Sequence, residues 1–404
     1  MELKPGYKQT EVGVIPEDWN CLPSGGIVKF FGGNAFSSNA ASENGIRWLK
    51  IANVGKRRID WSDASFLPHS YGNQFRSFLL TEGDVVMSLT RPIIDGQLKI
   101  ARLRSGDDPA LLNQRVGKII VGSETDLGFI YYALQTLRFV ASMGDAMAGT
   151  DPPNIGSQTL QKIPIPLPPT KAEQEAIAEA LGDADALLES LEHLIAKKRQ
   201  IKQGAMQELL TGKRRLPGFT GDWEERSIDE LADCLDSLRI PLNDAHRSKM
   251  KGDYPYCGAN GVLDYIDDYC VDDSVILMAE DGGYFDEYQT RPIAYRMSGK
   301  FWVNNHAHIL KSKEGFDQGF LFYSLVHKNI LSFLASGTRA KLNKSELLKI
   351  TVRQPNDEFE QTAIAAILSD MDAEIAALET KLAKARQIKQ GMMQELLTGK
   401  TRLV

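Results

Sequence analysis

Two segments of this 404-residue chain repeat each other, and this repeat limits the folds that the chain can adopt. Residues 173–216 and 360–403 align at a constant offset of 187 without a gap, and 29 of the 44 positions are identical. Chance does not produce such agreement. The chain is therefore a tandem duplication, in which each copy has a variable region followed by a nearly constant tail.

Each tail has the start and stop signals of one long helix. In the first copy Thr170 and Glu173 have the spacing of a capping box, and Pro168 and Pro169 prevent an earlier start. Gly212 stands where a C-terminal cap belongs. The second copy repeats the capping box and the glycine, so we expect two equivalent helices.

The apolar residues of each tail recur at alternating intervals of four and three residues for about three heptads. This period is nearer 3.5 than 3.6 residues, so we expect the two helices to pair with each other as a coiled coil. The alternative is that each helix packs only on its own globular region, as an amphipathic surface helix does. A rod of about forty residues, at about 1.5 Å each, is about 60 Å long and suits a spacer. The predicted seam consists of Ile177, Leu181, Ala184, Leu188, Leu191 and Ile195 in the first copy and of Ile364, Leu368, Met371, Ile375, Leu378 and Leu382 in the second.

The seam loses its apolar character at Lys198 and Lys202 in the first copy and at Lys389 in the second. The two copies are most alike in this part, because residues 199–213 match residues 386–400 at every position but one. Helix pairing alone tolerates many apolar choices, so one hypothesis is a binding surface that is used twice. Recent duplication without divergence explains the same identity equally well.

The variable regions are less alike but follow one plan. Each begins with a tryptophan after a turn-rich lead, continues through a β-rich centre and a helical stretch, and closes on a β-prone run. At an offset of 191, Met87 aligns with Met278 and Asn113 with Asn304. These features predict mixed α+β domains of about 150 residues, a common domain size. The expected order is a first domain at 1–169, a helix at 170–212, a second domain at 213–356, and a second helix with its tail at 357–404.

The charge of the chain does not suggest a protein that is coated in positive charge. The net charge is −6 and the pI is about 5.7, and residues 217–356 hold 16 basic and 21 acidic side chains. A nucleic-acid-binding protein of this composition must gather its lysines and arginines on one face or borrow positive charge from partners.

Composition also bears on the compartment. No stretch approaches the roughly 18 uncharged apolar residues that cross a bilayer, and the N-terminus has no apolar run typical of a secretory signal. The four cysteines are far apart and include no C-x-x-C pair, which disfavours a disulfide framework and a zinc site. We therefore expect a cytoplasmic protein with reduced thiols and no membrane contact.

The whole arrangement resembles the specificity subunit of type I restriction–modification enzymes. The resemblance covers essentially all of the chain, and its most specific parts are the repeated tail RQIKQGxMQELLTGKxRL and the segment LPGFTGDW at 216–223. In that family the two constant helices pack antiparallel, and two target-recognition domains each read half of a bipartite site in double-stranded DNA. The resemblance implies two methylation subunits and additional restriction (motor) subunits as partners. It also implies that S-adenosylmethionine and ATP bind to those partners, that this chain binds no cofactor, and that it directs adenine N6 methylation and restriction without catalysing either.

The resemblance has a geometric consequence. A tandem repeat folded back as an antiparallel pair acquires a pseudo-two-fold axis, and duplex DNA has one too. Two domains on the same face of DNA would lie about 34 Å apart, which is one helical turn. We expect the helices to act as a ruler, so that their length sets the unread gap between the two half-sites.

Three short motifs could suggest chemistry within the chain itself, but their residues fit poorly. The segment 151–154, Asp-Pro-Pro-Asn, resembles the [DN]-P-P-[YFW] motif of amino-methyltransferases, yet Asn154 is not aromatic and no F-x-G-x-G loop is present. The segment 399–401, Gly-Lys-Thr, lacks the earlier glycine of a phosphate-binding loop. His306 and His308 could bind a metal, although alternation along a strand explains them more simply. We therefore expect no catalytic residue and no metal site.

Two alternatives to the specificity subunit stay open: a self-contained DNA methyltransferase, and a scaffold that joins two proteins and never meets DNA. The missing cofactor loop speaks against the first.

Contact with DNA favours arginine or lysine on guanine, asparagine or glutamine on adenine, and basic side chains on phosphate. For each candidate, a structural role or simple exposure is an equally good explanation. The candidates are Arg57, Arg58, Arg76, Arg91, Asn113, Gln114 and Arg115 in the first domain and Arg291, Asn304, Asn305, His306, Arg339, Lys341 and Lys344 in the second.

Overall fold

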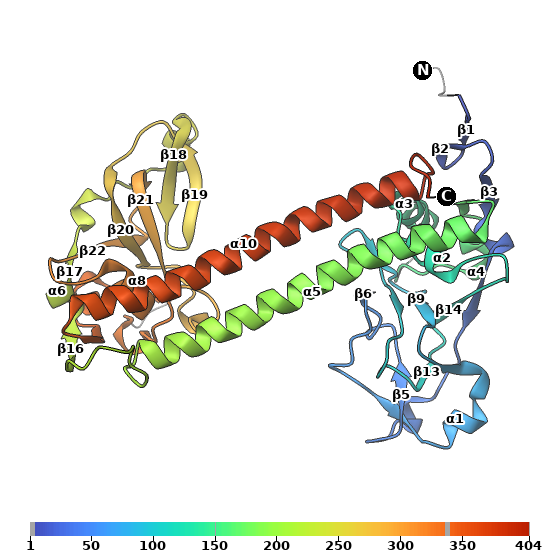
Figure 1. The fold of residues 1–404 in the computed structure, drawn as a ribbon, viewed down its shortest axis with the longest axis horizontal. Helices are drawn as coiled ribbons and strands as arrows, with labels where there is room; N and C mark the ends of the chain where they lie inside the picture. The colour runs from blue at the N-terminus through green and yellow to red at the C-terminus, as the bar shows by residue number, and fades with distance from the viewer. Residues whose placement is uncertain (1–4, 150, 336–339, 404) are drawn as a thin grey trace. The chain divides into compact units, whose positions relative to one another are not determined.

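The structure is a computed structural model that describes residues 5–149, 151–335 and 340–403. It divides into two compact units: the first comprises Met1–Ser190 and Leu382–Val404, and the second comprises Leu191–Lys381. Each unit holds one variable region and one part of each long helix (Figure 1). Strands and helices are mixed in both, so the α+β class predicted from the sequence is confirmed.

Two sheets form the body of the first unit. β9 (Val85–Ser88) lies at the centre of the larger sheet, and all four of its residues are buried, as expected of the apolar run Val-Val-Met. The larger sheet has the order β4 (Val28–Gly32), β14 (Val116–Val121), β9, β12 (Ile100–Arg102) and β6 (Lys56–Arg57). The smaller sheet has the order β7 (Phe66–Leu67), β5 (Ile46–Leu49), β13 (Ala110–Leu112) and β8 (Leu79–Leu80). Three further strand pairs are β1 (Tyr7–Thr10) with β2 (Gly13–Pro16), β10 (Ile93–Ile94) with β11 (Gln97–Leu98), and β3 (Asn20–Pro23) with β15 (Pro164–Leu167).

One six-stranded sheet forms the body of the second unit. Its central strand β20 (Val271–Ala279) is fully buried over its last five residues and pairs antiparallel on both sides. The sheet has the order β17 (Ala232–Cys234), β22 (Ala307–Ser312), β20, β21 (Ala294–Val303), β18 (Lys251–Gly258) and β19 (Gly261–Ile266). A separate pair consists of β16 (Trp223–Ser227) and β23 (Thr351–Pro355).

The shorter helices follow the sequence repeat in part. α2 (Leu127–Ala133) and α8 (Gln318–Leu325) begin at equivalent positions, and an aspartate caps each of them. The sequence predicts one helical stretch in each unit, at 129–143 and 320–334, and the two stretches end differently. After α2 the first unit has a second helix, α3 (Leu137–Ala146), whereas after α8 the described residues of the second unit form a 3-10 turn at Leu331–Phe333. Asn329 accepts a hydrogen bond from the Leu331 backbone at 3.1 Å, which favours a turn over a helix. The remaining short helices are α1 (Tyr71–Gln74), α4 (Ser157–Leu160), α6 (Ile228–Leu231), α7 (Asp244–Arg247) and α9 (Lys344–Leu347).

The long helices are α5 (Lys171–Leu209) and α10 (Glu358–Leu396). The Thr170 hydroxyl accepts from the Glu173 backbone at 3.3 Å, as an N-cap does. The second half of the predicted capping box is wrong, because the Glu173 carboxylate is buried and bound by Arg402 instead. Glu360 is likewise buried and bound by Arg215, with distances of 2.6 and 2.7 Å from its two oxygens. Each helix start is therefore tied to the tail that follows the other helix.

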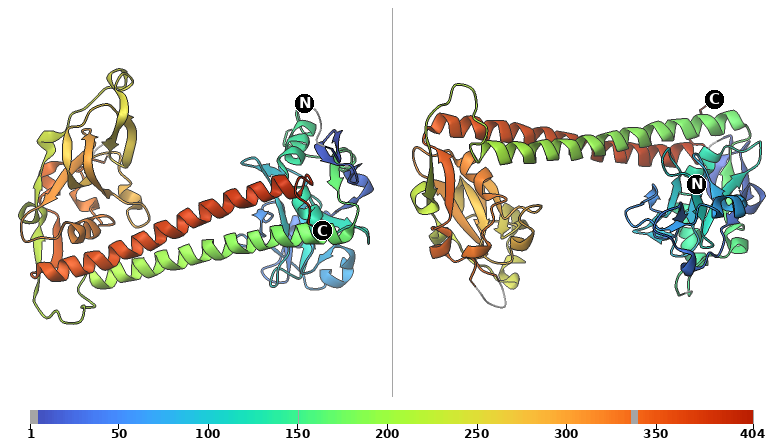
Figure 2. Two further views of the ribbon diagram at one scale, coloured as in Figure 1. Left: turned by 45° about the horizontal axis from the view of Figure 1, so that its top comes forward. Right: turned by 90° about the horizontal axis from the view of Figure 1, so that it is seen from below.

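Within each unit α5 and α10 lie side by side and run in opposite directions (Figures 1 and 2). In the second unit Lys198 pairs with Glu374 at 2.6 Å and Lys202 pairs with Asp372. In the first unit the matching pair is Lys389 with Asp185, at 2.6 Å. The lysines at which the predicted seam loses its apolar character thus form the ion pairs that join the helices.

Lys389 lies deep in this contact. Its side chain is 9% exposed, and burial lowers the pKa of Lys389 while Asp185 opposes that shift. Asp185 also accepts from the Tyr132 hydroxyl at 3.0 Å and from Arg57 at 2.6 Å. Asp372 repeats the arrangement in the second unit, where it accepts from Lys202 and from the hydroxyl of Tyr323, which aligns with Tyr132.

The long helices also enter the core of each unit. In the first unit Ile177 and Leu181 of α5 share one buried cluster with Leu396 of α10 and with the sheet. In the second unit Ile364 and Leu368 of α10 share a buried cluster with Leu209 of α5. Helix pairing and docking on the globular regions, which the sequence posed as alternatives, therefore occur together. Of the other seam positions, Leu188, Leu191, Ile195, Ile375 and Leu382 are buried, and Ala184, Met371 and Leu378 are half-buried.

We predict that Asp185→Asn destabilises the first unit by about 3–5 kcal/mol, because it leaves the buried Lys389 ammonium without its carboxylate. Chemical unfolding of the full chain measures this loss, and adding Lys389→Met should recover most of it. Lys384→Met, which removes an exposed charge from the same helix, is the control. A loss below about 1 kcal/mol for Asp185→Asn, or no recovery in the double variant, would contradict the prediction.

Candidate nucleic-acid interface

Three loops meet at one end of the central strands of the first unit. The Leu89 backbone N–H donates to the Arg115 carbonyl at 2.9 Å, and the Ile155 N–H donates to the Leu89 carbonyl at 3.1 Å. The Thr90 hydroxyl donates to the side-chain oxygen Oδ1 of Asn154 at 3.0 Å. Residues 89–91, 113–115 and 153–155 are called the first loop cluster, and they enclose a small open pocket of about 280 Å³.

The second unit repeats this arrangement with different side chains. The Glu280 N–H donates to the His306 carbonyl at 2.9 Å, and the Leu342 N–H donates to the Glu280 carbonyl at 2.7 Å. A β-bridge between Asp281 and Lys341 stands where the first unit has one between Thr90 and Asn154. Residues 280–282, 304–306 and 341–342 are called the second loop cluster. The same backbone frame therefore presents a different set of side chains in each unit.

Asn113 and Asn304 shape these loops. The Asn113 side-chain oxygen accepts from the Arg115 N–H at 3.2 Å, and the Asn304 oxygen accepts from the His306 N–H at 2.8 Å. Each asparagine thereby forms an Asx turn, and Asn304 is only 4% exposed. Both were candidates for reading adenine, but in the structure their role is to fix the turn that presents the next two residues.

The loop clusters bring together six of the other sequence-predicted residues. Gln114 and Arg115 are exposed, as is Arg91, which stands at a left-handed φ of 48°. In the second cluster Asn305 is exposed, while His306 pairs with Asp281 at 2.6 Å and Lys341 with Glu280 at 2.9 Å.

The remaining candidates lie elsewhere in their units. Arg57 faces α5 through its ion pair with Asp185, and Arg58 stands in the adjacent turn. Arg76 is exposed after α1, Arg291 lies over the ring of Tyr284, and Lys344 begins α9. Arg339 falls outside the residues that the structure describes.

A network of charged side chains packs against the second loop cluster and forms hydrogen bonds with it. Arg239 lies 3.1 Å from Asp236, bonds to Glu280, and donates to the Ala307 carbonyl at 3.3 Å. His308 is 1% exposed and bridges Asp236, at 2.7 Å, and the Leu342 carbonyl, at 2.8 Å. Both ring nitrogens of His308 therefore face oxygen atoms. The network thus ties the loop at 341–342 to β22 and to the start of the loop at 280–282.

Asp236, Cys234 and His308 place three potential metal ligands within 4.8 Å of one another. The guanidinium of Arg239 already neutralises Asp236, and the second ring nitrogen of His308 is held by a carbonyl. A metal ion here would face a fixed positive charge, so these residues are better explained as an ion-pair network.

The ion pairs set the ionisation of the two buried acids. Burial alone would raise the pKa of Asp236, but the hydrogen bond from His308 and the nearby Arg239 hold it below its usual value of 3.8. Burial would likewise raise the pKa of Glu280. The hydrogen bonds from Arg239 and Lys341 outweigh this effect, so the pKa of Glu280 is also lowered. Each group therefore stabilises the fold above its ordinary pKa, and this contribution disappears as the pH falls through the lowered pKa.

We predict that Asp236→Asn costs the full chain about 3–5 kcal/mol near neutral pH and less at about pH 3, because the carboxyl of the unfolded chain is then largely protonated while that of the folded chain has a lowered pKa. Denaturant unfolding at both pH values measures the difference. Asp253→Asn, an exposed change in the same unit, should have little effect at either pH. An equal cost at both pH values would show that the charge of Asp236 is not what stabilises this network.

Sequence reasoning missed several residues of this interface, among them Thr90, Asn154, Asp281 and Arg239. Asn154 was considered only as part of a poorly fitting methyltransferase motif, and it forms a β-bridge with Thr90. Its place beside Thr90 depends on a contact across 64 residues, which no local pattern signals.

These features define a class of protein: a duplicated α+β chain in which each unit carries one loop cluster on an equivalent frame and joins two antiparallel helices. Comparison with known proteins gives the family. Residues 16–203 and 220–387 each match the type I restriction modification DNA specificity domain. The chain belongs to this family and is a type I restriction–modification specificity subunit with target-recognition domains.

Individual relatives agree with this assignment. The chain is 40% identical over 211 residues to the type I restriction enzyme MjaVIII specificity subunit of Methanocaldococcus jannaschii, covering 52% of this chain and 49% of that one. It is 32% identical over 187 residues to the EcoAI specificity subunit of Escherichia coli, covering 46% and 31%. The chain thus spans half or less of the length of these relatives. A putative MjaX specificity subunit of M. jannaschii is 24% identical over 424 residues, covering 98% and 97%.

Among solved structures, the S subunit from M. genitalium has the same fold, with a TM-score of 0.68, 17% identity and 98% of each chain covered. In the part of the chain that the structure describes, no helix is long and apolar enough to cross a membrane.

Proposed function

We propose that this chain is the non-catalytic subunit that gives a type I restriction–modification complex its DNA specificity. Its two loop clusters read the two halves of a bipartite site, and partner subunits methylate adenine at N6 and restrict unmodified DNA. S-adenosylmethionine and ATP are bound by those partners. The observation that carries the proposal is the repetition of one loop frame with different exposed side chains, because two readers of unlike half-sites require this.

The side chains of the loop clusters suit base edges in the major groove. Gln114 and Arg115 offer the amide that pairs with adenine and the guanidinium that pairs with guanine. Asn305 and His306 offer an amide and an imidazole in the second unit. Lys341 completes the second cluster with a positive charge, although Glu280 already neutralises part of it.

Partner subunits need a surface that occurs twice, and the long helices have one. Ile201 of α5 is 47% exposed, and its repeat Ile388 of α10 is 54% exposed. Both lie in the segment that is nearly identical between copies. An exposed apolar residue that recurs in both copies suits contact with a partner, so we assign the two methylation subunits to this repeated segment.

We predict that Arg115→Ala weakens binding of the specific site by about 1–3 kcal/mol and relaxes the sequence of one half-site only. Lys341→Ala should weaken binding with little change in the bases read, because we expect Lys341 to contact a phosphate group of the DNA backbone. The measurement is DNA affinity of the reconstituted complex, together with single-molecule sequencing of methylated adenines. Arg76→Ala is the control, since Arg76 is exposed but outside the clusters. An unchanged site and affinity for Arg115→Ala would contradict this reading.

The ruler is tested by shortening both helices together. Deleting residues 187–193 and 381–387 removes one heptad from each helix between the pairs Asp185–Lys389 and Lys198–Glu374, so both pairs are retained. Each helix shortens by about 10 Å, which corresponds to about three base pairs. We predict a methylated site with the same half-sites and a gap shorter by about three base pairs. An active complex with an unchanged gap would exclude the ruler.

A further inference from the structure

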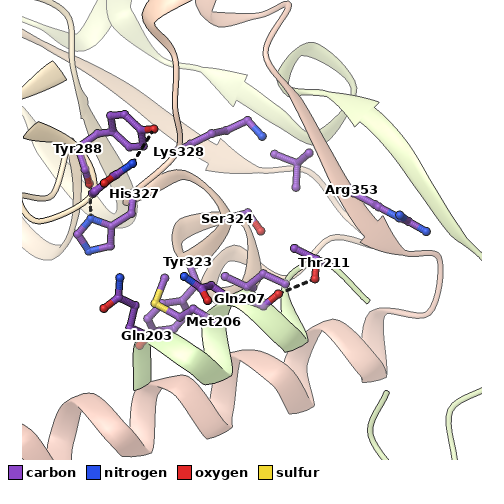
Figure 3. Close-up of a pocket in the computed structure, with 13 residues that line it drawn as sticks. Gln203, Met206, Gln207, Thr211, Tyr288, Tyr323, Ser324, His327, Lys328 and Arg353 are labelled. Atoms are coloured by element: carbon purple, nitrogen blue, oxygen red, sulfur yellow. Dashed lines mark hydrogen bonds between the residues drawn. The ribbon is translucent and has the colours of Figure 1, made fainter. Parts of the chain in front are cut away.

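The second unit contains a cavity of about 620 Å³ (Figure 3). Its walls come from the last turns of α5, from the segment at 288–289, from α8 and the turn that follows it, and from β23. Met206, Leu210, Tyr323 and Val352 make much of the lining apolar. A cavity of this size is typical of sites for small organic molecules.

Two hydrogen-bond donors in this cavity have no acceptor. The Ser324 hydroxyl is buried and has no hydrogen-bond partner among the described residues. The ammonium of Lys328 forms no hydrogen bond or ion pair with the described residues, and Glu225 influences it only from a distance. In Figure 3 both groups point to the same side of the cavity, toward β23.

The Ser324 hydroxyl is a buried donor without an acceptor, which destabilises the fold. The Lys328 side chain is half-buried, so its charge is partly desolvated and has no protein acceptor in the described residues. Burial accordingly lowers the pKa of Lys328. Arg353 stands on the same wall and adds positive charge. An oxyanion would satisfy both donors, and the apolar lining would accept the body of the molecule that carries it.

The first unit does not repeat this site. Ala133 of α2 stands where α8 has Ser324, so the hydroxyl is missing. Ala133 is also buried, in one cluster with Phe139 and Met143 of α3, the helix that the second unit lacks. A partner present in two copies would need the same donors in both units. The ligand of this cavity is therefore something that the chain binds once.

We propose that the cavity of the second unit binds one small organic anion, whose phosphate or carboxylate group accepts hydrogen bonds from Lys328 and Ser324. Its apolar or aromatic body lies against Met206, Leu210 and Tyr323. The site lies beside the repeated segment of α5, and it is independent of the base-reading role of the loop clusters.

Isothermal titration of the full chain tests the proposal with matched probes. Adenosine monophosphate and benzoate represent the two anion types, and adenosine and benzyl alcohol are their neutral counterparts. We expect at least one anion to bind once per chain, at least about tenfold more tightly than its counterpart. Lys328→Met should weaken that binding about tenfold or more, and Ser324→Ala about threefold. Lys249→Met, which removes an exposed charge from the same unit, should leave it unchanged.

The free energy of unfolding of the ligand-free chain gives an independent check, because a partly desolvated lysine without an acceptor destabilises the empty protein. Lys328→Met should therefore be at least as stable as the wild type. The proposal is overturned if neither anion binds below about 10 mM, if the neutral probes bind equally well, or if Lys328→Met binds normally. It is also overturned if duplex DNA displaces the bound anion, since the cavity would then serve the DNA backbone. A destabilised Lys328→Met variant would show that the lysine has a structural role instead.

Discussion

A lysine of one long helix paired with an aspartate of the other is the contact on which the rest of the structure depends. An apolar heptad seam alone tolerates a shift in helix register, because sliding one helix by seven residues again places apolar residues against apolar residues. Lys389 with Asp185, and Lys202 with Asp372, remove that tolerance, since a slip would leave a charge without its partner. The tyrosine hydroxyl that each aspartate also accepts fixes the helix pair to the neighbouring globular region.

The same register closes each unit around both helices. Arg402, at the end of the chain, binds Glu173 at the start of α5, and its guanidinium lies over the Trp19 ring. Arg215 and Trp223 repeat this arrangement with Glu360. In the first unit the Tyr7 hydroxyl also donates to the Gly399 carbonyl at 3.2 Å. The first unit is thus assembled from segments at the beginning, the middle and the end of the given sequence.

The sequence predicts the parts of this fold that depend on local pattern or on the repeat. The two long helices, their glycine caps, the equivalence of the units and the α+β class all follow from spacing and self-comparison. The hydrogen-bond partner of Glu173 could not be predicted, because its position at the helix start suits a local capping bond, whereas its actual partner, Arg402, is 229 residues away. Asn113 and Asn304 were correctly singled out as a matched pair, but an asparagine in a loop can read a base or form a turn, and only the backbone geometry decides. Arg57 was a candidate for DNA contact on residue type alone, and its pairing with Asp185 requires knowledge of where α5 lies.

Zero-length carbodiimide cross-linking of the monomeric full chain, followed by mass spectrometry, tests the antiparallel register most directly. The reagent joins a lysine to a carboxylate only when the two are in contact. The exposed pair Lys251–Asp264, at 2.9 Å within one hairpin, shows that the reaction works. The register described here predicts a link between Lys198 and Glu374 within one chain, accompanied by one between Lys202 and Asp372. Links from these lysines to other carboxylates of α10, or a reaction confined to Lys251–Asp264, would contradict it.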